Sequence, residues 1–94
     1  MRCVSIAALV AERTPTVSGR LGGLKEIDPL VFMAPIGVLG DYQPRGTFRF
    51  AIAQRDGQLV PVECECSVSW RMFAGADPDM VEVTVQPTSA PLIV

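Results

Sequence analysis

V-P-V-E-C-E-C-S-V-S-W-R-M, the stretch from Val60 to Met72, carries a large apolar side chain at every second position. Proline, glutamate, serine and arginine fill the positions between them. Because successive side chains of a β-strand point to opposite faces, this period of two predicts a half-buried strand. The same alternation places Trp70 on the apolar face, where we expect it to pack in the core.

A second alternating stretch, 47–54, precedes this strand, and Asp56-Gly57 marks the turn between them. A two-residue loop would set phenylalanines against glutamates, whereas a loop with an odd number of residues keeps the apolar faces together. We therefore predict an odd loop with a glycine bulge at Gly57. The predicted register pairs Phe50 with Cys64, Phe48 with Cys66, Ile52 with Val62 and Arg49 with Glu65.

A third alternating stretch, 80–86, follows the central strand after a turn at 76–79 that contains Pro78. An even loop satisfies both faces at once. It pairs Met72 with Val81, Trp70 with Val83, Val68 with Val85 and Arg71 with Glu82. Together the three stretches, 47–54, 60–72 and 80–86, predict an antiparallel meander within an all-β fold, a small antiparallel sandwich or barrel.

The flanking segments are less regular. Residues 2–13 are apolar on both parities and contain several alanines, so a central strand is the preferred interpretation and a short helix the alternative. Prolines and glycines are spread through 14–46 and exclude a long helix there. Within it the apolar segment 29–40 predicts one or two short interrupted strands at a sheet edge. Residues 91–94 form an apolar tail.

Length and composition limit the function. The 94 residues suffice for one small domain, 1–94. The hydrophobic fraction of 49 % and the mean hydropathy of +0.34 are high for such a small chain, so we expect some apolar surface to face a partner. The net charge of −2 and the scattered arginines argue against nucleic acid as the main ligand.

The odd count of three cysteines does not build a disulfide framework, which predicts a reducing compartment. The first eleven residues make a poor signal peptide, and no apolar stretch reaches the roughly 18 residues that span a bilayer. We therefore expect a cytoplasmic or virion protein that is not secreted and has no membrane partner.

Side chains for catalysis are scarce. The chain contains no histidine, which removes the usual general base, the usual zinc ligand and any Ser-His or Cys-His pair. Cys64 and Cys66 share one face of the strand and could form a redox pair or a soft-metal clip, but we interpret them as small core hydrophobes because only Cys3 remains as a further ligand. Glu63 and Glu65 fit a solvated face with arginine partners. We predict no catalytic residues, metal or cofactor, and no enzyme.

These patterns favour a structural or interaction protein that docks on itself, as a homo-oligomer, or on a larger assembly. A virion accessory part, such as a capsid decoration or a head-tail piece, is one such assembly by analogy at the level of class. The candidate interface comprises the apolar residues of 29–40 and of the C-terminal tail: Leu30, Phe32, Met33, Ile36, Val38, Leu39, Leu92, Ile93 and Val94.

Two other classes remain open. An oligonucleotide/oligosaccharide-binding type of barrel would bind single-stranded nucleic acid if Phe48 and Phe50 were exposed as a stacking surface. An acidic compact domain could instead inhibit a larger enzyme complex by occupying a cationic groove.

Overall fold

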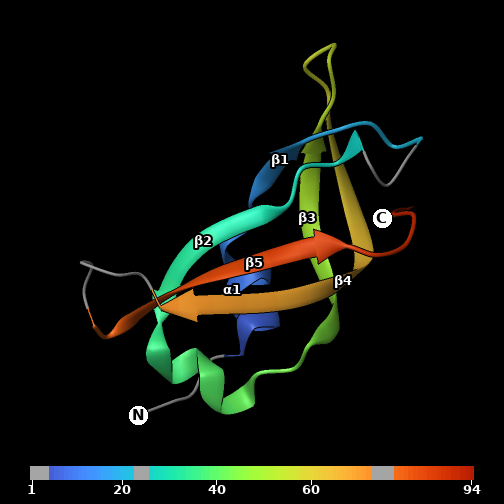
Figure 1. The fold of residues 1–94 in the computed structure, drawn as a ribbon. Helices are drawn as coiled ribbons and strands as arrows, with labels where there is room; N and C mark the ends of the chain where they lie inside the picture. The colour runs from blue at the N-terminus through green and yellow to red at the C-terminus, as the bar shows by residue number, and fades with distance from the viewer. Residues whose placement is uncertain (1–4, 23–25, 73–77) are drawn as a thin grey trace.

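A single curved sheet forms most of the molecule. The computed structural model describes residues 5–22, 26–72 and 78–94. Its sheet has the strand order β1-β3-β4-β5-β2, and β6 pairs with β4 beside this path (Figure 1). The elements are α1 (Ile6–Arg13), β1 (Thr16–Ser18), β2 (Leu30–Pro35), the 3₁₀ helix η2 (Ile36–Asp41), β3 (Arg45–Ala53), β4 (Leu59–Met72), β5 (Met80–Pro87) and β6 (Leu92–Ile93). The prediction of an all-β fold is confirmed.

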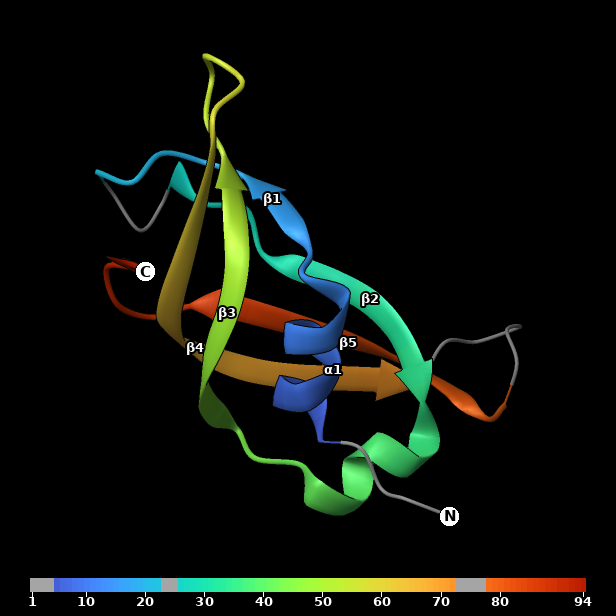
Figure 2. The ribbon, with the colours of Figure 1, turned by 180° about the vertical axis from the view of Figure 1, so that it is seen from behind.

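The sheet curls into a nearly closed barrel. β4 is the longest strand and bends, so that residues 59–67 pair with β3 and residues 66–72 pair with β5. Next to the two edge strands, β1 and β2, the chain is joined by a bridge between Gly19 and Ile27. β1 runs parallel to β3 while the other named strand pairs are antiparallel, so the sheet is mixed. α1 lies across the concave face between β3 and β2 (Figure 2).

The register between β4 and β5 agrees with the prediction at every pair named above. Met72 lies opposite Val81, Trp70 opposite Val83 and Val68 opposite Val85. On the outer face the Arg71 Nε donates to Glu82 Oε1 at 2.8 Å. The predicted turn at 76–79 lies partly outside the described residues.

The register between β3 and β4 has the predicted parity but is shifted by two residues. Phe50 lies opposite Val62 rather than Cys64, and Arg49 pairs with Glu63, with 2.9 Å between Nε and Oε2, rather than with Glu65. The reason lies in the loop, which has an odd number of residues as predicted but comprises 55–57, whereas the predicted register requires 56–58. Gln54 N–H donates to the Gln58 carbonyl, which puts Gly57 last in the loop at a φ of 85°. Glycine adopts this left-handed conformation without the steric cost of a Cβ.

The N-terminal segment is a helix, so the preferred strand prediction for 2–13 is wrong for the part that the structure describes. Ser5 caps α1, its hydroxyl accepting a hydrogen bond from Ala8 N–H at 3.0 Å. Ile6 and Val10, one turn apart, are buried against the sheet. Thr14 ends the helix in a left-handed conformation, with its N–H bonded to the Val10 carbonyl.

The apolar segment 29–40 contains one strand, which agrees with the prediction of one or two. β2 pairs along its whole length with β5, and the chain then continues into η2 instead of a second strand. Leu30 and Ala34 of β2 and Val38 of η2 are buried in the core. Phe48, Phe50 and Ile52 complete that core from β3, as the alternation predicted.

Candidate functional site

The predicted interface residues do not form one surface. Leu30 and Val38 are core residues, so their assignment to an exposed interface was wrong. Phe32, Met33 and Leu39 are partly buried, while Ile36, Leu92, Ile93 and Val94 are exposed. The exposed tail pairs with β4 at Val62 and Glu63, whereas β2 pairs with β5. The two predicted segments therefore belong to different parts of the sheet.

An apolar surface that the sequence did not indicate lies at the C-terminal end of β4. Trp70 and Met72 are 41 % and 52 % exposed, which contradicts the prediction that Trp70 packs in the core. Their cross-strand neighbours Val83 and Val81 are fully buried, so the same face of the sheet is covered at β5. We call Trp70 and Met72 the β4 rim.

The β4 rim is exposed because β3 stops before it. The last link between the two strands is the 2.8 Å hydrogen bond from Val68 N–H to the Pro44 carbonyl. Tyr42 donates its hydroxyl to the Val68 carbonyl at 2.6 Å. Beyond Val68, no described residue pairs with this side of β4.

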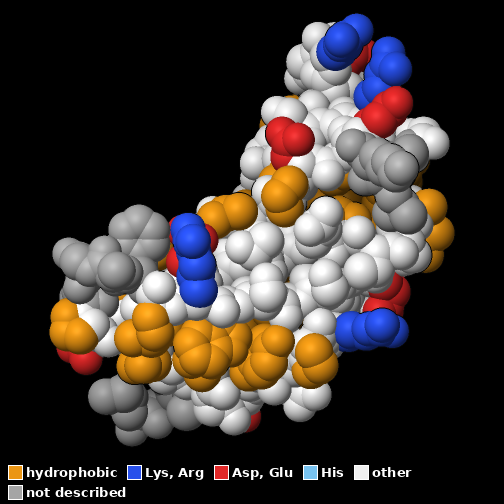
Figure 3. Space-filling model, in the orientation of Figure 1, with side chains coloured by type: hydrophobic (Ala, Val, Ile, Leu, Met, Phe, Trp, Pro, Cys, Tyr) orange, Lys and Arg blue, Asp and Glu red, His pale blue; other side chains and the backbone are white. Residues whose placement is uncertain are grey.

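The main chain of the β4 rim faces this free side. Thr88 N–H bonds to the Glu65 carbonyl, so the odd-numbered residues of β4 turn their N–H and C=O groups toward β5. Val68, Trp70 and Met72 turn theirs the other way. Figure 3 shows hydrophobic side chains in a row along the lower side of the molecule, where this half of β4 runs in Figure 1. An unpaired strand edge with apolar side chains is a typical site of pairing with another chain.

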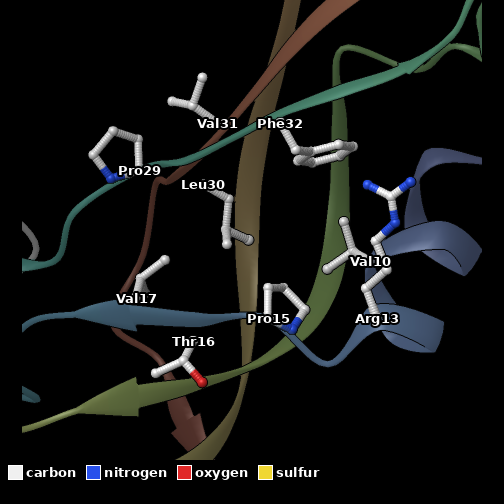
Figure 4. A pocket seen from close by; sticks show the side chains of 9 residues that line it. All are labelled: Val10, Arg13, Pro15, Thr16, Val17, Pro29, Leu30, Val31 and Phe32. Atoms are coloured by element: carbon white, nitrogen blue, oxygen red, sulfur yellow. The ribbon is translucent and has the colours of Figure 1, made fainter.

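A groove of about 310 Å³ separates β1 from β2. Its walls include Val17 of β1 and Leu30 of β2, whose side chains point toward each other across it, and Val10 of α1 (Figure 4). The Arg13 guanidinium lies 5.8 Å from the centroid of the Phe32 ring and donates to the Met33 carbonyl at 3.5 Å. This groove could not be predicted from the alternation of apolar residues, because it depends on where the two edge strands separate.

The thiols of Cys64 and Cys66 are buried, as predicted for small hydrophobes. Cys64 Sγ donates to the Ser89 carbonyl at 3.2 Å, and Cys66 Sγ to the Cys64 carbonyl at 3.5 Å. Burial raises the pKa of both thiols, that of Cys66 to about 12. Both thiols are therefore protonated near neutral pH, and the protonated thiol is not the nucleophilic form of cysteine.

The outer face of the meander carries paired charges. Thr47 Oγ1 donates to Glu65 Oε1 at 2.5 Å, and Arg49 pairs with Glu63 as described above. Within the described ranges no three cysteine or acidic side chains are placed to hold a metal ion; Cys3 lies outside those ranges. Glu63 therefore has the arginine partner that the sequence suggested, whereas the partner of Glu65 is Thr47.

The chain matches no protein-family model, no curated protein and no solved structure. In the part of the chain that the structure describes, none of the helices has the length and apolar character needed to cross a lipid bilayer.

Proposed function

We propose that this protein is a non-enzymatic interaction protein that assembles with further copies of itself through the β4 rim. The observation that supports this proposal is the coincidence, at Trp70 and Met72, of exposed apolar side chains with main-chain groups that lack a partner among the described residues. An added strand would satisfy both kinds of group together.

The rim is self-complementary. In an antiparallel pair of two such edges, Trp70 of one copy lies opposite Met72 of the other, and their N–H and C=O groups bond in both directions. The two Arg71 side chains would then be neighbours, but each copy holds a Glu82 carboxylate 2.8 Å from its own Arg71, which offsets the repulsion.

The side chains add a hydrophobic contribution. A tryptophan buries about 150–250 Å² when fully covered, so covering the exposed part of Trp70 would contribute about 2 kcal/mol. Tryptophan is also among the residues that most often dominate the binding energy of protein interfaces.

Binding of single-stranded nucleic acid depended on Phe48 and Phe50 being exposed. Phe48 and Phe50 are buried in the core and offer no stacking surface to bases. Inhibition of an enzyme complex and a place in a virion remain predictions from the sequence.

Sedimentation velocity over a range of protein concentrations tests the proposal, with the fluorescence of Trp70, the only tryptophan, as a second readout. We expect association with increasing concentration and a shift of Trp70 emission to shorter wavelength as its ring leaves water. Met72→Lys should abolish both effects. Leu59→Lys is the matched control, because Leu59 is a similarly exposed apolar residue at the opposite end of β4. A protein that stays monomeric up to about 1 mM, the weak end of specific binding, would refute self-assembly.

A further inference from the structure

The groove between β1 and β2 lies where the barrel remains open. On one side of it the two edges are joined, because Asp28 N–H bonds to the Ser18 carbonyl and Arg20 N–H to the Glu26 carbonyl. From that point β1 and β2 diverge, and the space between them is the groove. The site is separate from the β4 rim, since none of the residues that line it belongs to β4.

The β1 side of the groove presents an unpaired main-chain position. The Pro15 carbonyl accepts from Ala51 N–H, and Gly19 N–H donates to the Ala53 carbonyl, so the odd-numbered residues of β1 face β3. By the alternation of a strand, Thr16 turns its N–H and C=O toward the groove. No described residue bonds to either group.

The β2 side of the groove presents a second unpaired main-chain position. Ile36 N–H donates to the Asp79 carbonyl, which continues the β2–β5 register and shows that the even-numbered residues face β5. Val31 and Met33 consequently turn their main-chain groups toward the groove, and the hydrogen bond from Arg13 to the Met33 carbonyl agrees with this direction. Val31 has no such partner among the described residues, and its side chain is 56 % exposed.

The described residues that line the groove carry positive charge only. Of the described residues that line it, Arg13 alone is charged, and no carboxylate accompanies it although the chain as a whole carries a net charge of −2. The guanidinium lies beside the Phe32 ring at one end of the groove (Figure 4). A bidentate pair with a carboxylate is the geometry that guanidinium favours most.

We propose that this groove binds a short extended segment of a partner protein, which pairs with Thr16 and Val31 as an added strand and places an acidic side chain against Arg13. An apolar side chain next to the acidic one points to the opposite face of the added strand, where it packs on the exposed Val31 side chain. The volume of about 310 Å³ is at the lower end for ligand pockets, so the bound part is only a few residues long. This mode gives affinity through main-chain hydrogen bonds and specificity through the side-chain contacts.

Two fluorescein-labelled peptides test the proposal by fluorescence polarisation with the full chain. The first is Gly-Val-Thr-Val-Asp-Gly and the second Gly-Val-Thr-Val-Lys-Gly, both with the same label and the same blocked ends, so that they differ only in the charge of the fifth residue. We expect the aspartate peptide to bind at least about tenfold more tightly, and Arg13→Gln to remove the difference. Equal binding of the two peptides, or no binding of the aspartate peptide up to about 1 mM, would overturn the proposal.

Amide hydrogen exchange tests the added strand directly. Thr16 and Val31 N–H should exchange rapidly in the free protein and slowly with the aspartate peptide bound. Val31→Pro deletes the groove-facing donor at an edge position where proline is tolerated, and should weaken binding by about tenfold. Val31→Thr keeps both the donor and the branched side chain and should bind like the wild type. If Val31→Pro remains folded by circular dichroism and binds normally, the pairing is wrong. Association through the β4 rim, followed by sedimentation, should be unchanged in both variants, so the two proposals can fail separately.

Discussion

Replacing Thr14, at the end of α1, with glycine should stabilise the folded protein. It adopts a φ of 41° and a ψ of 58°, in the left-handed region, and no other described non-glycine residue has a positive φ. In this conformation a Cβ crowds the following carbonyl oxygen, and a β-branched side chain is the least suited to it. The Thr14 side chain is exposed and no hydrogen bond from its hydroxyl compensates for the strain within the described residues.

The expected gain is a difference of two terms. Removing the Cβ relieves about 1–2 kcal/mol of steric strain, while the extra backbone freedom of glycine in the unfolded chain costs about 0.5–1 kcal/mol. Thr14→Gly should therefore raise the free energy of unfolding by about 0.5–1 kcal/mol. For a domain of this size that corresponds to a rise in melting temperature of about 2–8 °C.

Urea unfolding followed by far-ultraviolet circular dichroism measures this difference. Thr14→Ala is the control, because it removes the same exposed atoms but keeps the Cβ and its strain. It should lie below the glycine variant in stability. If Thr14→Gly is no more stable than Thr14→Ala, the strained C-cap assigned to α1 is wrong.

Two further outcomes concern the core. Ile52→Ala should lower the free energy of unfolding by about 2–5 kcal/mol, because Ile52 is fully buried, while Leu92→Ala, at a site 70 % exposed, should change it by less than about 0.5 kcal/mol. Urea midpoints compare the two, and similar losses would contradict the packing described for β3. Alkaline pH should destabilise the fold through Cys66, whose pKa is raised from its ordinary 9.0 to about 12. The unfolded chain loses this proton first, so the stability that Cys66 contributes is intact below pH 9 and falls as the pH rises toward 12, by about 1.4 kcal/mol per unit. In Cys66→Val the decline between pH 9 and 11 should be shallower; an identical slope would show that the thiol titrates normally.

The meander could be predicted from the sequence because a period of two records which face of a strand meets the core. At Arg71 and Glu82 the outer face added a second constraint, and the register between β4 and β5 was correct. Between β3 and β4 the same reasoning could not distinguish registers that differ by two residues. Such registers keep every face assignment, and the choice between them depended on the position of Gly57 in the loop.

The helix α1 was mistaken for a strand because its key spacing fits both structures. Ile6 and Val10 are four residues apart, which places them on one face of a helix and also on one face of a strand. The deciding signal was local, namely the Ser5 hydroxyl that accepts from Ala8 N–H. A capping serine three residues before that amide was present in the sequence but was not recognised as a cap.

Alternation also cannot say how far along a strand its apolar face is covered. Trp70 and Met72 continue the pattern of buried residues in β4, yet they are exposed because β3 has already ended. Leu30 and Val38 show the opposite error, since an irregular apolar segment was interpreted as surface although both side chains are buried in the same core cluster as Ile6 and Val10 of α1.

Each of the two unpaired edges begins at a proline. The positions of these prolines in the sequence therefore indicate the two candidate surfaces better than the alternation of apolar and polar residues does. Pro44 accepts from Val68 N–H but has no N–H to return, so Tyr42 donates to the Val68 carbonyl instead and the ladder between β3 and β4 stops. Pro29 lies between Asp28, which bonds to β1, and Leu30, which faces β5, at the point where the ladder between β1 and β2 stops. A proline thus lies where each of the two strand edges opens, and at Pro44 the missing N–H explains why the ladder stops.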